Sequence, residues 1–259
     1  MLVVWTLWQR ELVRFYRDKA RVIGALVPPL IFWVAIGAGL GDSFRPPGAP
    51  AGMNYLQYFF PGTVLLVVLF TSVFATISLI EDRREGFLQS VLVAPVPRFG
   101  IVAGKVLGAS TLGFLQGLLF LSLAPAAGLR IDLPALIFVL LLLGLSSAGL
   151  AGLGFWIAWR LNSTQGFHSV MNLFLIPMWM MSGALFPSSG APAWMRAVIK
   201  LNPLSYAVAG MQNSFIAGAS TGSSVMGAAP PRPVCLLVLA LFAGATFLAC
   251  VFSARRGDQ

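Results

Sequence analysis

Charged residues are scarce in this chain. Only 10% of its 259 residues are Asp, Glu, Lys or Arg, whereas a typical soluble domain has about 25%. Apolar residues make up 58% of the chain. A protein with so few polar groups cannot cover a surface that faces water, so the composition predicts an integral membrane protein with little mass left for a separate aqueous domain.

Several motifs of catalysis are also missing. The sequence contains no G-x-x-x-x-G-K-[ST] run, which excludes a Walker-type phosphate loop for ATP on this chain. The single histidine, His168, and the two cysteines, Cys235 and Cys250, do not have the spacing of metal ligands. The cysteines are 15 positions apart in one apolar run, or roughly 22 Å on a helix, which is too far for a disulfide. We therefore expect no catalytic residue, metal or cofactor here.

Two further classes of membrane protein are disfavoured by the same scarcity. An ion-coupled carrier usually needs an acid in mid-membrane as a relay, and the expected spans carry none there. An intramembrane hydrolase would need a serine placed next to His168 across two helices for catalysis. This histidine stands near a span end among other polar residues, which favours a packing role. Energy for any uphill transport must therefore come from a partner.

Six apolar runs are long enough to cross a hydrocarbon core of about 30 Å. We expect the spans at residues 22–40, 58–80, 101–128, 133–158, 166–186 and 234–253. In the third, Lys105 is expected to snorkel to the interface, and small residues at regular spacing predict close approach of another helix. These are Gly104, Gly108, Gly113 and Gly117, with Gly144, Ala148 and Gly152 as a second set in the fourth span. The fold class is an all-α polytopic membrane protein with one transmembrane domain, residues 1–259.

The regions outside the spans also show helical patterns. Residues 3–19 form an amphipathic helix on a helical wheel, with Trp5 and Trp8 on the apolar arc and Arg10, Arg14 and Arg17 opposite. This pattern predicts an interfacial helix with its Trp rings at headgroup depth, although a basic flank that only sets topology would also fit. Between spans five and six, residues 188–220 predict a pair of short re-entrant or interfacial helices, broken at Asn202-Pro203.

The segment Glu81–Arg98 is the most charged part of the chain after the N-terminal region. Its three acids and three bases cancel, and the residues that follow Gly86 recur at helical spacing until Pro95 and Pro97 stop the helix. The apolar members are Phe87, Leu88, Val91 and Leu92. A neutral, mixed-charge helix suits a protein partner better than anionic lipid, so we interpret this ridge as a docking surface with Arg83 and Glu85 at its rim. A solvated linker is the alternative.

Basic residues indicate the topology. The net charge of +9 is not a nucleic-acid signal, because the bases gather at the ends of apolar runs. Twelve of them fall on the side that carries both termini if there are six spans, against five on the other. The positive-inside rule then places both termini and the 81–98 segment in the cytoplasm, with residues 188–233 outside.

Two groups of residues resemble a known family. The first is the cytoplasmic segment with Glu81, Arg83, Arg84, Glu85, Gly86, Pro95 and Pro97, followed by Gly104-Lys105. The second is MNLFLIPMWMMSGALFP at 171–187 followed by LNPLSYAVAGM at 201–211. In this order they resemble ABC type-2 transporter permeases over essentially the whole chain. One departure is Phe87-Leu88, where the family often has Thr-Leu or Ser-Leu, which leaves the capping contact open.

The resemblance implies a membrane subunit of an ATP-driven exporter in a bacterial-type inner membrane. It would pair with a second permease copy, identical or paralogous, and with separate ATPase subunits that carry ATP and Mg²⁺; an ATP-independent channel or scaffold is the alternative. The coupling helix would contact the ATPase through Glu81, Arg83, Arg84, Glu85, Gly86, Phe87, Leu88, Val91 and Leu92. The interfacial helix, with Trp5, Trp8, Arg10, Arg14 and Arg17, would contribute to the same contact. An amphipathic substrate (a drug, a lipid or a lipid-linked saccharide) would leave through a dimer interface lined by spans one, two and five.

Overall fold

The computed structural model describes residues 2–40, 54–93, 95–129, 131–185, 191–215 and 230–256. Within these ranges every regular element is a helix, which confirms the predicted class. The elements are α1 (Leu2–Arg17), α2 (Lys19–Leu40), α3 (Tyr55–Ala75), α4 (Ile77–Arg84), α5 (Phe87–Val93), α6 (Arg98–Leu121), α7 (Leu133–Arg160), α8 (Thr164–Trp179), the π-helix η1 (Met180–Ala184), α9 (Ala193–Leu201), α10 (Pro203–Phe215) and α11 (Arg232–Arg256).

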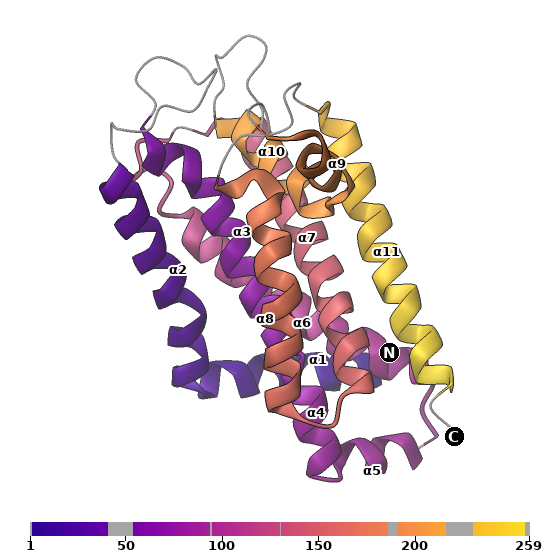
Figure 1. Ribbon diagram of the computed structural model, residues 1–259. Coiled ribbons are helices and arrows are strands. Elements are labelled where there is room, and N and C mark those ends of the chain that lie inside the picture. Colours follow the sequence, from indigo (N-terminus) through magenta and orange to yellow (C-terminus); the bar gives the residue numbers. More distant parts are fainter. Residues whose placement is uncertain are drawn as a thin grey trace.

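Five long apolar helices in the described residues could cross a membrane, and they correspond to five of the six predicted runs. They are α2, the continuous pair α3–α4, α6, α7 and α11. The remaining run, 166–186, corresponds to α8, which has 16 residues and continues into the five residues of η1. Figure 1 shows α8 standing upright among the long helices. The protein is therefore a polytopic helical membrane protein.

The third predicted span, 101–128, extends beyond the C-terminal end of its helix. The helix α6 begins at Arg98, three residues earlier than predicted, because Pro97 has the extended conformation of an N-cap. It ends at Leu121 rather than at residue 128. From Ser122 onwards the chain forms turns that include Pro125 and Gly128, since proline cannot continue the helical hydrogen-bond ladder.

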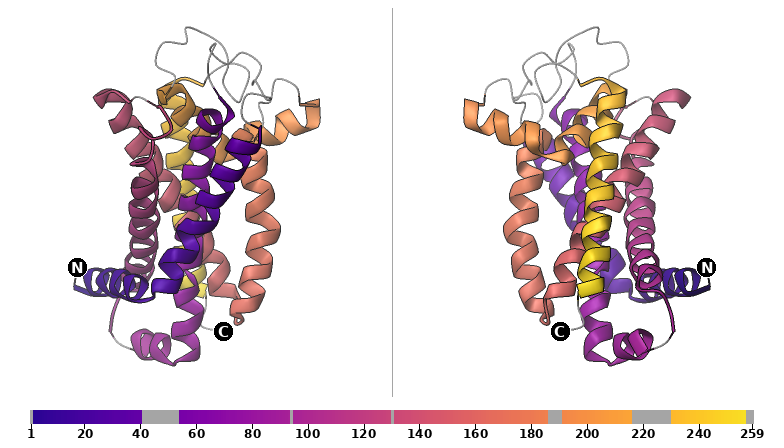
Figure 2. Two further views of the ribbon diagram at one scale, coloured as in Figure 1. Left: turned by 90° about the vertical axis from the view of Figure 1, so that its left-hand side faces the viewer. Right: turned by 90° about the vertical axis from the view of Figure 1, so that its right-hand side faces the viewer.

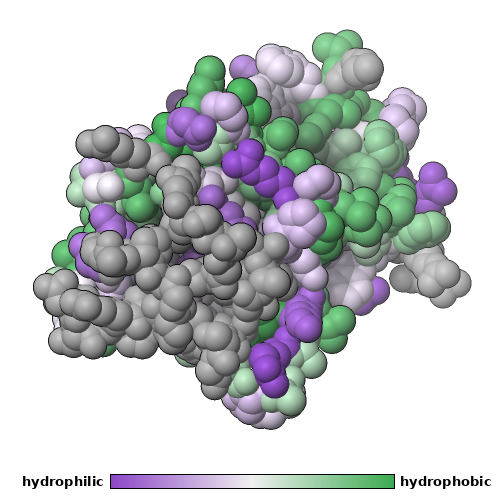
Figure 3. Space-filling view, turned by 90° about the horizontal axis from the view of Figure 1, so that it is seen from above, coloured by the Kyte–Doolittle hydropathy of each residue, from purple (hydrophilic) through white to green (hydrophobic). Residues whose placement is uncertain are grey.

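The helix α3 forms the centre of the bundle. Nearly all of its residues are buried, and it packs against α2, α6 and α7. By contrast, α2 and α11 lie at the two edges of the bundle (Figure 1) and expose large apolar side chains such as Ile31 and Leu241. Seen from the end that carries α9 and α10, hydrophobic side chains reach the perimeter beside hydrophilic ones (Figure 3). An apolar perimeter suits a helix bundle that lies in lipid.

Small residues allow close approach of other helices, as predicted. One of the partners, however, is α1, which is not a predicted span. A Cβ on Gly104 would lie 2.8 Å from Leu7 Cβ, so it is α1 that packs on this part of α6. Further along α6, Gly113 and Gly117 face Ser72 and Val68 of α3. On α7, Gly152 faces Thr246 of α11, whereas a Cβ on Gly144 would meet nothing within 4 Å.

The two ends of the bundle differ in architecture. At one end α1 lies across the long helices and α5 projects beyond them, and the described ends of the chain, in α1 and α11, are both found there (Figures 1 and 2). We call this the junction end. At the opposite end lie α9 and α10, separated at Asn202 as the Asn-Pro pair predicted. Residues 41–53, 186–190 and 216–229 lie outside the described part, as does Arg130, so the ends of the predicted 188–220 helical pair fall there.

Candidate functional site

The segment 81–98 is not one amphipathic helix, which corrects the sequence interpretation. Glu81–Arg84 belong to α4, which extends the second span after a single break at Thr76. Gly86 then turns the chain with a φ of 77°, a left-handed conformation that glycine adopts without a Cβ penalty. Only Phe87–Val93 form the separate short helix α5, which ends before Pro95 as expected. Three of the predicted docking residues, Glu81, Arg83 and Arg84, are therefore at the end of a membrane helix.

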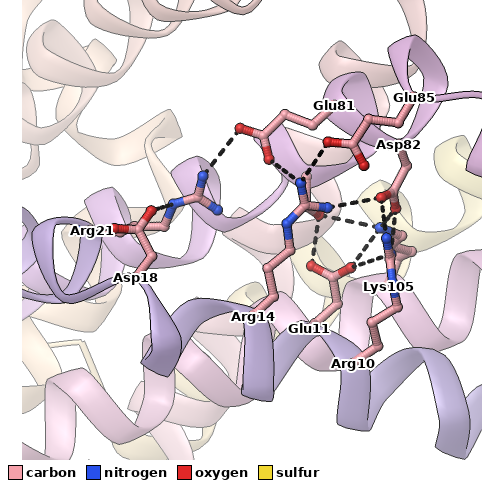
Figure 4. A network of polar contacts seen from close by, with 10 residues as sticks. Arg10, Glu11, Arg14, Asp18, Arg21, Glu81, Asp82, Glu85 and Lys105 are labelled. Atoms are coloured by element: carbon pink, nitrogen blue, oxygen red, sulfur yellow. Dashed lines mark hydrogen bonds and ion pairs between the residues drawn. The ribbon is translucent and has the colours of Figure 1, made fainter.

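Asp82 is the centre of the charged cluster at the junction end. Its carboxylate is fully buried. Arg10 donates to it through both terminal nitrogens, at 2.8 Å and 2.6 Å, and Arg14 donates at 2.8 Å. The ammonium group of Lys105 is in contact with the second carboxylate oxygen. Asp82 thus joins α4 to α1 and α6 (Figure 4), and the paired hydrogen bonds from Arg10 also fix the plane of the guanidinium.

Glu11 is the second buried acid of the cluster. It accepts a hydrogen bond of 2.6 Å from Lys105 Nζ and another of 2.6 Å from the hydroxyl of Ser78. The Lys105 side chain is only 4% exposed, so the expectation that it snorkels to the interface is wrong. The reason is electrostatic: two acids from other helices lie within reach, and a buried charge is tolerated when it is paired and hydrogen-bonded. We call Arg10, Glu11, Arg14, Asp82 and Lys105 the charged junction.

A more exposed set of charges surrounds the charged junction. Arg14 also contacts Glu81 at 2.9 Å and Glu85 at 3.5 Å. Arg21, at the start of α2, contacts Glu81 at 3.2 Å and Asp18 at 3.5 Å. These pairs are partly solvated, so each contributes little to stability by itself. Together they extend the contact between α1 and α4 to the first turn of α2.

The buried face of α1 differs from the predicted apolar arc. Leu7, Glu11 and Phe15, spaced by four, face the bundle. Trp5 is 59% exposed, which leaves its ring free for the membrane interface, but Trp8 donates a 3.0 Å hydrogen bond to Thr111 of α6. The hydrogen bond thus ties Trp8 to α6, while the headgroup depth of both rings stays a prediction. On the polar face, Arg10 and Arg14 belong to the charged junction, whereas Arg17 is exposed and makes no ion pair with the described residues.

The predicted apolar ridge of α5 points toward its own chain. Leu88 is 3% exposed, and Phe87 and Val91 pack partly buried against the core. The guanidinium of Arg10 lies 3.9 Å from the centroid of the Phe87 ring, a cation–π contact. Hydrogen bonds from Arg10 to Asp82 raise the pKa of Arg10 further, so this cation is permanent. A partner therefore cannot insert between these side chains and the bundle in this conformation.

The opposite face of α5 is free. Gln89 and Ser90 are exposed, and Val93 is 88% exposed. The side chain of Leu92 lies outside the described part of the structure. Glu85, just before the Gly86 turn, is exposed as predicted. The accessible face of α5 is thus more polar than the sequence pattern indicated.

Arg83, predicted at the rim, is only partly exposed and binds backbone carbonyls, and the exposed Arg84 binds one as well. Arg83 donates to the carbonyls of Trp159 at 2.7 Å and Leu161 at 3.0 Å. Arg84 donates through Nε to the Asn162 carbonyl at 3.1 Å. These carbonyls end α7 and begin the connection to α8, where a helix leaves acceptors without intrahelical partners. The end of α4 therefore also anchors the α7–α8 connection.

A groove opens beside the charged junction, between α1, α2, α3, α4 and α8. Its volume is about 510 Å³, with apolar walls that include Pro28, Phe70 and Phe74 and a polar end at Arg21 and His168. Thr71 and Glu81 also line it, and the buried Thr71 hydroxyl has no hydrogen-bond partner among the described residues. The His168 ring packs against Phe74 with centroids 4.8 Å apart, which matches the packing role expected of it. This arrangement offers an apolar cavity with a polar rim.

The described residues contain no cluster of three or more His, Cys, Asp or Glu side chains that could hold a metal ion. Both cysteines are buried free thiols. The contacts of the charged junction are ion pairs between helices, without a nucleophile and base in hydrogen-bond geometry among the described side chains. Its arrangement is that of a mechanical connection between α1, α4, α5 and α6.

Comparison with known proteins agrees with this picture. The family model described as ABC-2 type transporter matches residues 3–216. The putative transport permease ycf38 of Cyanophora paradoxa is 29% identical, over 79% of this chain and 71% of that protein. The inner membrane transport permease YadH of Escherichia coli (strain K12) is 25% identical, over 82% of each.

A third relative is matched over less than half of its own length. The linearmycin resistance permease protein LnrN of Bacillus subtilis (strain 168) is 31% identical, over 73% of this chain and 46% of that protein. The match to the family model covers both the charged junction and the α9–α10 pair. The matched residues therefore include the long apolar helices α2, α3, α6 and α7, the crosswise α1 and the projecting α5. The chain belongs to the ABC-2 type transporter membrane family and is a permease subunit, a membrane subunit without an ATPase domain.

Proposed function

We propose that this permease is the membrane half of an ATP-driven exporter and that it docks its ATPase at the junction end. The observation that carries the proposal is the position of α5, which projects beyond the bundle (Figure 1) and yet is held to it by Leu88 and Arg10. A helix that is rigidly attached on one face and exposed on the other can pass a push from a partner into the bundle.

The docking surface differs from the one the sequence pattern indicated. We assign it to the exposed face of α5, with Gln89, Ser90 and Val93, and to Glu85 beside the turn. Arg83, Phe87, Leu88 and Val91 support this surface from behind, because their side chains bind or pack within the chain. Arg84 and the exposed Arg17 would lie at the margin of the contact.

The topology that supports docking has six spans, with α8 and η1 together forming the fifth, and with both termini in the cytoplasm. The charged side chains of α1 and α4 gather at the junction end, as the positive-inside rule requires of a cytoplasmic face. The crosswise α1 would lie in the inner-membrane interface, with Trp5 and Tyr16 exposed to lipid. ATP and Mg²⁺ would be bound by the partner ATPase.

The cargo is proposed to be amphipathic, such as a drug, a lipid or a lipid-linked saccharide. The groove between α2, α3 and α8 combines apolar walls with a polar end near the junction, which suits a molecule with a tail and a headgroup. The apolar faces of α2 and α8 are exposed, including Ile31, Leu173 and Phe174. A second permease copy would pack on these faces and enclose the transport pathway. The relatives' names, which include linearmycin resistance and nodulation, do not narrow the cargo further.

Cysteine cross-linking tests the docking surface directly. Both native cysteines are buried, so Ser90→Cys and Val93→Cys introduce single reactive thiols on α5. We expect both variants to cross-link to a co-purified candidate ATPase through a short reagent with a maleimide at one end and a photoreactive group at the other. Leu241→Cys, which is also exposed but lies on α11 at the bundle edge, is the control and should not cross-link.

The alternative, an ATP-independent channel or scaffold, makes the opposite prediction. The ATPase would then fail to co-purify, and reconstituted vesicles would release a lipophilic dye at the same rate with and without ATP. Cross-linking at Leu241→Cys but not at Val93→Cys would also refute the assigned surface.

A further inference from the structure

Arg10 holds together the two helices on either side of the Gly86 turn. Its guanidinium donates two hydrogen bonds to Asp82 on α4 and lies against the Phe87 ring on α5. The turn itself offers little resistance to bending, because Gly86 lacks a side chain and a Cβ there would meet nothing within 4 Å. Contacts outside the turn must therefore set the angle between α4 and α5. Arg10 supplies one of them and the packing of Leu88 supplies another.

Asp82 determines where Arg10 lies. The paired hydrogen bonds, at 2.8 Å and 2.6 Å, match the fork of the guanidinium to both carboxylate oxygens, a geometry that fixes the plane of the cation as well as its position. Arg14 and Lys105 hold the same carboxylate from α1 and α6. The Phe87 contact therefore has a fixed support on three helices.

Stability alone does not account for so much buried charge. Replacing a buried ion network by apolar side chains of similar volume is often neutral or stabilising, because desolvation offsets the electrostatic attraction. A fully buried carboxylate surrounded by three cations is thus a poor way to increase stability. What a network of directional hydrogen bonds does provide is one defined geometry between α1, α4 and α6.

We propose that Asp82 is a positioning residue for ATPase docking: acting through Arg10, it sets the direction in which α5 presents its exposed face. This inference rests on the proposed docking function and deepens it, because it names a residue that never touches the ATPase. Asp82 lies behind the docking surface and transmits its influence through Arg10 and Phe87.

The test measures the affinity of the candidate ATPase for the full-length permease in lipid nanodiscs. Asp82→Asn keeps the shape of the side chain but removes its charge, and we expect the Kd to rise on the order of tenfold, a usual size for coupling between separate sites. Arg10→Met should weaken binding to a similar extent. The double variant should be no weaker than either single one, because both changes break the same connection.

Two controls separate positioning from general damage. Asp132→Ala removes an N-cap hydrogen bond of α7 at the opposite end of the bundle, so it should lower the melting temperature without changing the Kd. Val93→Asp alters the proposed contact surface itself, so its effect should add to that of Asp82→Asn. The conservative Asp82→Glu should recover part of the affinity lost in Asp82→Asn.

Each outcome decides the matter. The positioning role would be overturned if Asp82→Asn bound the ATPase with wild-type affinity. It would also be overturned if the losses of Asp82→Asn and Arg10→Met added up in the double variant. A third contrary result would be a loss of affinity in Asp132→Ala in proportion to the fall in its melting temperature. If Val93→Asp weakens binding and Asp82→Asn does not, the docking function stands and this inference alone fails. If the wild-type permease binds no ATPase, the docking function itself is wrong and the inference falls with it.

Discussion

The close packing of α1 on α6 makes a quantitative prediction for Gly104→Ala. The added Cβ would lie 2.8 Å from Leu7 Cβ and 3.1 Å from the Val4 carbonyl oxygen, whereas carbon atoms pack best at about 3.5–4.0 Å. The Val4 contact is with backbone, so a change of side-chain rotamer cannot relieve it. The whole of α1 has to move away from α6.

Overpacking of this kind costs about 1–3 kcal/mol, while replacing a helical glycine by alanine returns up to about 1 kcal/mol. Gly144→Ala on α7 is the matched control, because its Cβ would meet nothing within 4 Å and only the helix-propensity gain applies. The difference between the two variants therefore isolates the packing cost, about 1–3 kcal/mol. At roughly 2–4 °C per kcal/mol for a chain of this size, Gly104→Ala should melt several degrees below Gly144→Ala.

Thermal unfolding of the purified protein, followed by intrinsic fluorescence, measures this difference. Hydrogen exchange locates it: amides of α1 should exchange faster in Gly104→Ala, and those of α11 should not. Equal melting temperatures for the two variants would show that α1 is not seated on the glycine face of α6.

Two further predictions concern hydrogen bonds to backbone carbonyls. Trp179→Phe removes a buried 2.7 Å bond to the Gly62 carbonyl, so the free energy of unfolding should fall by about 1–3 kcal/mol; an unchanged melting temperature would contradict this. Arg83→Met releases the Trp159 and Leu161 carbonyls and should speed hydrogen exchange in the α7–α8 connection while leaving α9 unchanged. Equal protection of that connection in both proteins would refute the anchoring role.

Hydropathy predicted most of the fold because lipid leaves little choice. A run of 20 or so apolar residues must be helical in order to satisfy its backbone, so five of the six runs could be placed within a few residues. The break at Asn202 and the stop before Pro95 were also predictable, since proline removes a backbone donor. Pro125 is the same kind of signal for the early end of α6, but the uncharged residues 122–128 continue the apolar run and hide the end of the helix from hydropathy.

The charged junction could be predicted only in part. Lys105 in an apolar run is a signal that an acid lies opposite, because an unpaired charge there is costly. A helical wheel, however, sorts residues of one helix by polarity and cannot show that Glu11 is buried against another helix. The sequence pattern shows Asp82 only as one of three acids in a neutral segment, since its burial depends on α1 lying across the end of α3–α4.

The same reasoning explains why Leu88 was assigned to a partner. Sequence periodicity shows that one face of a helix is apolar but not whether that face packs on its own chain or on another. In α5 the chain changes direction at Gly86, and the contacts of Phe87 with Arg10 and of Leu88 with the core hold the apolar face against the bundle. The residues that are free to meet a partner are consequently the more polar ones on the other side.

Lys105 is synthesised after both of the acids that it binds, Glu11 and Asp82. Glu11 precedes Lys105 by 94 residues, and Asp82 precedes it by 23. While the ribosome is still making the second span, α1 has no lysine to hold it and the glycine surface on which it rests does not yet exist. Seating of α1 on α6 is therefore a late event in biogenesis, and a nascent chain arrested before α6 has only earlier partners for α1, such as Asp82 of α4.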